Sequence, residues 1–206
     1  YRHCATLRLA NVSSDRLGGL IKNGRCLEGP KSKIHFNEDG ISRILSFVEK
    51  WKPRQGNKRN HRTYVRQLRA KAYILTLRSS GMRVHEMSKL RVKDIDFTEG
   101  TAPIIGKGDK QGVVMFNQEA LDAIQAYWQA RGDLFPDAPA FMRHDPGGNG
   151  KSLPIRPSTG QNIVHMVAKM ALGADYDPKI TVHAFRHNAV TMVLRITGNL
   201  VKAQEY

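Results

Sequence analysis

Residues 181–187 read TVHAFRH and carry the strongest local signal in the chain. At positions i and i+3 of a helix, the side chains of His183 and Arg186 project from the same face. Phe185 and Ala189 give that helix a partly separate apolar face for packing on a core. The segment predicts a helix that starts near residue 183, ends at about residue 196 and presents a histidine and an arginine together. A helix start with solvated cations is the alternative interpretation.

A second signal lies upstream, where residues 81–87 read GMRVHEM. Gly81 is suited to end one helix in a left-handed conformation, and Arg83 then lies at the start of the next. A helix start can aim a guanidinium group and free N–H groups at an anion. The alternative is a surface pair between Arg83 and Glu86, which contributes under about 1 kcal/mol.

The remaining hydrophobic patterns predict a mainly helical α+β fold with a small antiparallel sheet. Helices are expected after Asn37, over about 63–79 and 83–91, after Asn117, and after Ser158. Short β-type runs at 102–105 and 113–116 flank a glycine-rich turn, and apolar residues alternate with charges from Ile95 to Phe97. This stretch predicts a β-hairpin or a three-stranded sheet.

Two of these helices have a readable core face. After Asn117, a good N-cap, the apolar stripe is Leu121, Ile124 and Trp128. In the helix after Ser158, residues Ile163, Val167 and Met170 are expected to point inward. These stripes indicate that both helices pack against one core.

The net charge restricts the class of partner. The chain of 206 residues has 33 Lys and Arg against 18 Asp and Glu, a formal charge of +15. Such a balance favours a polyanion, with nucleic acid ahead of an anionic membrane surface. Residues 51–71 contain eight Lys or Arg and no acid, which predicts either a phosphate-facing patch or a solvated loop and helix start. No run of eighteen apolar residues is present, so the sequence predicts no membrane span.

The two cysteines, Cys4 and Cys26, are too few for a disulfide scaffold. They favour a reducing compartment, and the cytoplasm is the expected location. With His3 and His35 they lack the paired close spacing of a zinc site, so no metal site is expected.

Together these motifs resemble the catalytic domain of the tyrosine recombinase (phage integrase) family over about residues 37–206, and an incomplete catalytic domain is expected over residues 36–206. The family has an arginine in a block like residues 81–87, then a lysine in a G-K-G-x-K hairpin turn, then an H-x-L-R-H motif. Here the turn lysine is Lys107, 24 residues after Arg83, and the last motif is residues 183–187. Residues 1–35 would be a remnant of the family's helical core-binding domain and its linker.

The resemblance implies a mechanism that uses neither metal nor ATP. A tyrosine hydroxyl attacks a DNA phosphate and forms a 3′-phosphotyrosine bond, which a 5′-hydroxyl later reverses. Arg83 and Arg186 would hold the nonbridging oxygens, and Lys107 would protonate the leaving 5′-oxygen. His183 would bind the phosphate or assist proton transfer, and Glu86 would support Arg83.

The resemblance also places one essential group outside the sequence. The family's last histidine and its tyrosine nucleophile lie further after the second arginine than the 20 residues that follow Arg186 here. Tyr206 does not match the nucleophile position, so no nucleophile is expected within the chain and the fragment itself is expected to be inactive.

The expected partner is double-stranded DNA, with a synaptic tetramer when the protein is intact. Lys58, Arg59, Arg62 and Lys110 are the residues expected to contact DNA. Two alternatives remain open: a non-catalytic DNA-binding module on the same fold, and an RNA-binding protein. The few aromatic residues show no stacking pattern, which disfavours readout of single strands.

Overall fold

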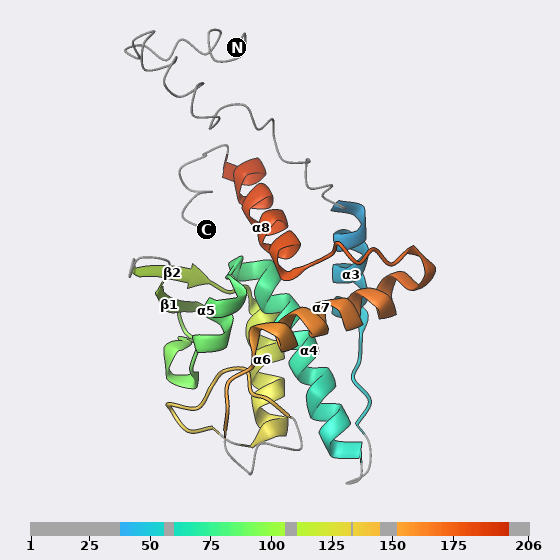
Figure 1. Cartoon of the computed structure of the whole chain (residues 1–206). Coiled ribbons are helices and arrows are strands. Elements are labelled where there is room, and N and C mark those ends of the chain that lie inside the picture. Colours follow the sequence, from blue (N-terminus) through green and yellow to red (C-terminus); the bar gives the residue numbers. More distant parts are fainter. Residues whose placement is uncertain (1–37, 56–59, 106–110, 133, 145–151, 198–206) are drawn as a thin grey trace, which may run out of the picture. The chain divides into compact units, whose positions relative to one another are not determined.

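The computed structural model describes residues 38–55, 60–105, 111–132, 134–144 and 152–197 (Figure 1). All of them lie in one compact unit, residues 37–206. Its helices are α3 (Glu38–Lys50), α4 (His61–Ser80), α5 (Val84–Lys89), α6 (Gln118–Arg131), α7 (Pro157–Leu172) and α8 (Val182–Thr197), with short 3₁₀ turns at η2 (Val92–Asp94) and η3 (Gly173–Asp175). Strands β1 (Thr101–Ile105) and β2 (Gln111–Met115) complete the fold. The predicted mainly helical fold with a small antiparallel sheet is confirmed.

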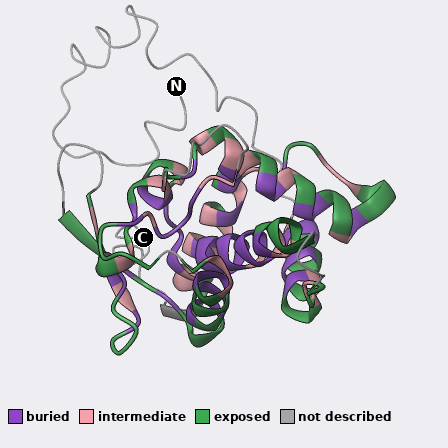
Figure 2. Ribbon diagram, turned by 90° about the horizontal axis from the view of Figure 1, so that it is seen from below, coloured by how far each residue is buried: buried purple, intermediate pink, exposed green. Residues whose placement is uncertain are grey.

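Helix α4 is the central element. It packs against α3, α6, α7 and α8, and a continuous run of its residues from Ala72 to Leu77 is buried. Figure 2 shows the buried positions gathered where the helices face one another. The helix ends at Gly81, which has a φ of +59° and donates its N–H to the carbonyl of Leu77. This left-handed turn, which favours glycine, fixes where the chain leaves the core.

The sheet is an antiparallel hairpin of two strands, with Thr101 opposite Met115 and Ile105 opposite Gln111. The stretch from Ile95 to Phe97 does not form a third strand among the described residues. The carboxylate of Asp96 accepts hydrogen bonds from the backbone N–H groups of Thr98 and Glu99, so the chain turns there. In place of the predicted third strand there is a single antiparallel β-bridge between Asp96 and Thr101.

The N-cap and core face predicted for α6 are confirmed. The side chain of Asn117 accepts a hydrogen bond from the N–H of Ala120, and the stripe of Leu121, Ile124 and Trp128 is buried. The cap satisfies an N–H that would otherwise have no partner at the helix start.

One of the three residues predicted to face the core from α7 does not do so, and that part of the prediction is wrong. Ile163 and Val167 are buried as expected, but Met170 is 47% exposed. The buried face of α7 also includes Ala168 and Leu172, so near its end the core stripe runs along the i+4 row instead of through Met170.

Candidate active site at the end of helix α4

The turn after α4 holds Arg83 in place through Glu86. The backbone N–H of Arg83 donates to Oε2 of Glu86 at 2.7 Å, and its guanidinium Nη1 donates to Oε1 at 2.9 Å. The Glu86 side chain is 5% exposed, whereas that of Arg83 is 54% exposed. The hydrogen bonds from Arg83 therefore satisfy the buried carboxylate of Glu86. The exposed part of the Arg83 guanidinium remains accessible to a ligand.

Helix α8 brings the second arginine to the same turn. Phe185 and Ala189 are buried and pack α8 onto the domain, with α4 among its contacts. This packing directs Arg186 to the carbonyl oxygen of Gly81, to which its Nη1 donates a hydrogen bond. The two residues are separated by 105 positions in the sequence. Figure 1 shows the start of α8 next to the C-terminal end of α4.

The electrostatics of this turn favour an anion. Burial is the main cause that lowers the pKa of Arg186, the nearby guanidinium of Arg83 lowers it further, and Glu86 opposes both. Arginine keeps its proton despite such a shift, so two positive groups stand close together with one carboxylate. A bound phosphate would relieve their mutual repulsion, and strained charge pairs of this kind are typical of functional sites.

His183 lies one turn before Arg186 on α8, and its side chain is exposed. Because i and i+3 residues share a helix face, the imidazole stands on the side of α8 that carries Arg186. The structure thus brings together Arg83, Arg186 and, by its place on the helix, His183.

Comparison with known proteins shows the family to which the chain belongs. A model of the phage integrase family matches residues 36–206. The chain belongs to the phage integrase family.

Relatives and solved structures of this phage integrase family member are consistent with the match. A tyrosine recombinase of Agathobacter rectalis is 28% identical over 184 residues, covering 85% of this chain and 57% of that protein. Tyrosine recombinase XerC of Pelobacter propionicus is 32% identical over 139 residues, covering 67% and 43%. The chain therefore spans about half the length of the curated relatives that it matches.

Two crystal structures share the fold. The XerA recombinase gives a TM-score of 0.62 at 23% identity, covering 87% of this chain and 57% of that one. The XerH site-specific recombinase, bound to its difH substrate in a pre-cleavage complex, gives 0.63 at 20% identity, covering 84% and 46%. At these identities the likeness shows the fold alone.

The other predicted site residues of this family member are dispersed or undescribed. Four of them lie outside the described residues: Lys58, Arg59, Lys107 and Lys110. Arg62 is exposed in the first turn of α4, whereas Arg83 follows the end of that 20-residue helix. A helix of this length spans about 30 Å, so the structure does not bring Arg62 to the two arginines of the turn.

Part of the basic segment holds the domain together. Arg66 and Arg69 donate to the backbone carbonyls of His144 and Met142 at 2.6 and 2.7 Å. The ammonium of Lys71 donates to the carbonyls of Glu49 and Trp51. Three of the eight cations in residues 51–71 thus bind backbone oxygens of their own domain, a use that charge counting alone does not reveal.

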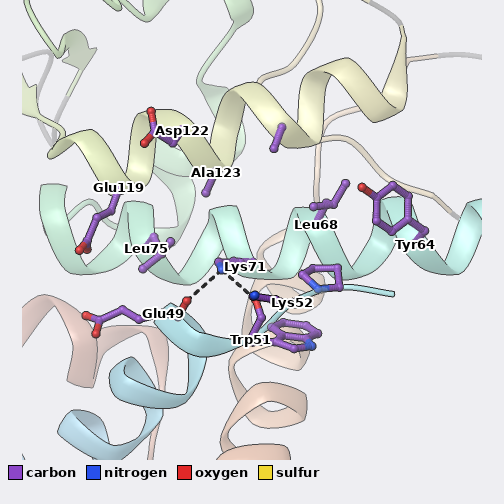
Figure 3. Close-up of a pocket in the computed structure, with 12 residues that line it drawn as sticks. Glu49, Trp51, Lys52, Tyr64, Leu68, Lys71, Leu75, Glu119, Asp122 and Ala123 are labelled. Atoms are coloured by element: carbon purple, nitrogen blue, oxygen red, sulfur yellow. Dashed lines mark hydrogen bonds between the residues drawn. The ribbon is translucent and has the colours of Figure 1, made fainter. Parts of the chain in front are cut away.

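A hollow of about 440 Å³ lies elsewhere, between the end of α3 and helices α4 and α6 (Figure 3). Its wall combines apolar side chains such as Leu68 and Leu75 with the carboxylates of Glu119 and Asp122. Neither Arg83 nor Arg186 lines it, so the hollow is separate from the candidate active site.

Two of the tyrosines are excluded as nucleophiles by burial. Tyr73 and Tyr127 are both 0% exposed, and burial raises the pKa of the Tyr73 hydroxyl. Neither oxygen can reach a DNA phosphate without unfolding of the core. Both side chains therefore pack within the helical core.

The part of the chain that the structure describes contains neither a membrane-crossing helix nor a cluster of metal ligands. No helix there is both long and apolar enough to cross a bilayer. In the same part of the chain, no three His, Cys, Asp or Glu side chains are grouped so as to hold a metal ion.

Proposed function

We propose that this chain supplies the phosphate-binding part of a tyrosine recombinase active site, in a protein that cuts and rejoins double-stranded DNA at specific sites. The observation that supports this most directly is the convergence of Arg83 and Arg186 on the turn at Gly81. Two arginines held by the fold, one on each side of a turn, fit the oxygens of a single phosphodiester.

In the proposed reaction, a tyrosine hydroxyl attacks the scissile phosphorus while the bond to the 5′-oxygen breaks. The pentacoordinate transition state gains negative charge on its nonbridging oxygens. Arg83 and Arg186 donate hydrogen bonds to those oxygens and stabilise that charge, which is the largest contribution that a preorganised site can make. The 3′-phosphotyrosine bond then stores the energy for rejoining by a 5′-hydroxyl.

Proton transfer is assigned to two further residues. Lys107, which lies between β1 and β2 in the sequence, protonates the leaving 5′-oxygen as a general acid. His183 binds the phosphate or helps to remove the proton of the attacking hydroxyl. Glu86 acts through Arg83, because both of its oxygens are already bonded to that residue.

The proposed partner is double-stranded DNA, contacted also by Lys58, Arg59, Arg62 and Lys110. The formal charge of +15 supports a polyanion, and the XerH structure contains a DNA substrate of that recombinase. A synaptic tetramer on DNA and a cytoplasmic location belong to the same proposal. A non-catalytic DNA-binding module on this fold is the second candidate, supported by the same charge.

A trapping assay tests the proposal. A duplex enriched from a random pool by binding to the chain is nicked near its centre, so that a cleaved product cannot be rejoined. The chain is expected to shift this duplex on a native gel without leaving a covalent band on a denaturing gel. A chimaera carries, after Tyr206, the part of Pelobacter propionicus XerC that follows the matched segment, and it is expected to form a covalent band. Binding with no covalent band from the chimaera would favour the non-catalytic module.

A further inference from the structure

The start of helix α8 is held by a side chain of another helix. Gln161 lies on α7, and its Oε1 accepts a hydrogen bond from the backbone N–H of Val182 at 3.2 Å. Val182 is the first residue of α8, where N–H groups have no partner within the helix itself. Gln161 thus caps α8 from outside, and His183 is the next residue along the chain.

A second hydrogen bond fixes the orientation of the Gln161 amide. Its Nε2 lies 2.9 Å from Nε2 of His165, one turn further along α7. Nδ1 of His165 lies 2.7 Å from the hydroxyl of Tyr176, whose ring also stacks under the ammonium of Lys169 at 5.2 Å. The amide, the imidazole and the phenol therefore form one chain of hydrogen bonds that ends at α8.

The donor and the acceptor in each of these hydrogen bonds follow from the bond between Gln161 and Val182. Because Oε1 of Gln161 accepts from Val182, its Nε2 is the donor toward His165, and Nε2 of His165 must accept. A neutral imidazole then carries its proton on Nδ1 and donates it to the hydroxyl oxygen of Tyr176. Each of the three hydrogen bonds then joins one donor to one acceptor.

We propose that Gln161 is a positioning residue for His183 and Arg186, with His165 and Tyr176 setting the orientation of its amide. The inference rests on the proposed function of α8 as the carrier of phosphate-binding groups. Arg186 has two further anchors, the carbonyl of Gly81 and the buried Phe185 beside it. Loss of the Gln161 cap therefore acts first on the turn that contains His183.

The first test is the protonation site of His165 in the unmodified chain. Ring ¹⁵N shifts measured at pH 8, above the ordinary pKa of an imidazole, are expected to show the proton on Nδ1. The proposal is overturned if they show it on Nε2. This measurement needs no variant and no DNA.

Two substitutions then separate the cap from general packing. In Gln161→Glu the carboxylate can only accept, so it keeps the bond from Val182 and forces His165 to donate through Nε2. The ring proton is expected to move from Nδ1 to Nε2, with amide exchange at residues 182–184 within about twofold of the unmodified chain. In Gln161→Met, exchange there is expected to be at least about tenfold faster. Gln118→Met, at an exposed helix start, is the matched control and is expected to change nothing at α8.

The chimaera gives the functional readout. Gln161→Met is expected to slow formation of the covalent band while the affinity for the duplex stays within about threefold, and Gln161→Glu is expected to restore the rate. Equal rates for all three proteins would contradict the positioning role. If the unmodified chimaera binds no DNA or forms no band, the proposed function fails, whereas the ¹⁵N and exchange results still decide whether Gln161 holds α8.

Discussion

A Cβ atom on Gly160 would overlap the hydroxyl of Tyr73 and lie 2.9 Å from its ring carbon Cζ. The same atom would meet Cγ2 of Val84 at 3.3 Å. Val84 is the first residue of α5 and directly follows Arg83. The absence of a side chain at Gly160 therefore lets α7 pack closely on α4 and α5, beneath the turn that holds the first arginine.

Gly160→Ala is expected to lower the free energy of unfolding by about 1–3 kcal/mol, because the core must shift to accept the methyl group. Urea denaturation measures this directly. Gly112→Ala is the control, since its Cβ would meet Ile104 at an ordinary 3.5 Å. Equal effects of the two substitutions would show that the contact with Tyr73 does not limit the approach of α7.

Tyr73→Phe is expected to leave stability unchanged or to raise it slightly. Among the described residues, the buried Tyr73 hydroxyl has no hydrogen-bond partner, so its removal relieves a desolvation cost. The substitution should also reduce the penalty of Gly160→Ala, because the overlapping oxygen is gone. A double-mutant cycle with no coupling between the two sites would contradict this account.

Lys71 is expected to stabilise the end of α3. Its ammonium donates to the carbonyls of Glu49 at 3.2 Å and Trp51 at 2.8 Å (Figure 3), and burial lowers its pKa. Lys71→Met should lower the free energy of unfolding by about 1–2 kcal/mol, since charged hydrogen bonds to the last carbonyls of a helix are lost. The exposed Lys89→Met removes the same charge and should change stability by under about 0.5 kcal/mol. A loss no larger than that of the control would refute the cap.

His144 is expected to make the domain less stable at mildly acidic pH. Burial first, and then the nearby arginines, lower its pKa to about 4 from an ordinary 6.5. The hydroxyl of Tyr127 accepts from the N–H of Met142 and lies 2.9 Å from Nε2 of His144, which can accept the hydroxyl proton while the ring is neutral. Between pH 6.5 and 4 the unfolded chain binds a proton at His144 and the folded chain does not. The stability that comes from the neutral ring is therefore fully present above pH 6.5 and is lost as the pH falls toward 4.

Urea denaturation at a series of pH values from 7 to 4 measures this loss of stability. One proton sets an upper limit of about 1.4 kcal/mol per pH unit, and the partial exposure of the ring makes the slope smaller. His144→Gln should flatten this part of the profile, whereas the exposed His85→Gln should leave it as it is. An identical slope for all three proteins would rule out His144 as its source.

Local patterns predicted the parts of the fold that depend on neighbouring residues. The Asn117 cap and the Leu121, Ile124 and Trp128 stripe need only a few consecutive positions, and both were correct. Asp96 shows the limit, because alternation predicted a strand where its carboxylate makes a turn. Met170 shows another, because tertiary packing decides which helical row is buried near the end of α7.

The site could be predicted only in part. The motifs around Arg83 and Arg186 indicated two arginines that belong together, and their convergence on Gly81 is a property of the folded chain. The network of Gln161, His165 and Tyr176 could not be foreseen. Its only local signal is the i, i+4 spacing of the first two residues, which is common in helices. For the basic residues 51–71, composition alone does not distinguish a phosphate contact from the carbonyl contacts that Arg66, Arg69 and Lys71 make.

The most direct test of the central claim is the rate of covalent band formation by the chimaera at saturating duplex, for Arg186→Ala and Arg62→Ala. If Arg83 and Arg186 stabilise the charged transition state, Arg186→Ala should slow the reaction by about 10²–10³-fold with little change in affinity. Arg62→Ala should weaken binding and leave the rate at saturation unchanged. A chimaera with Arg186→Ala that forms the band as fast as the unmodified one would contradict the account.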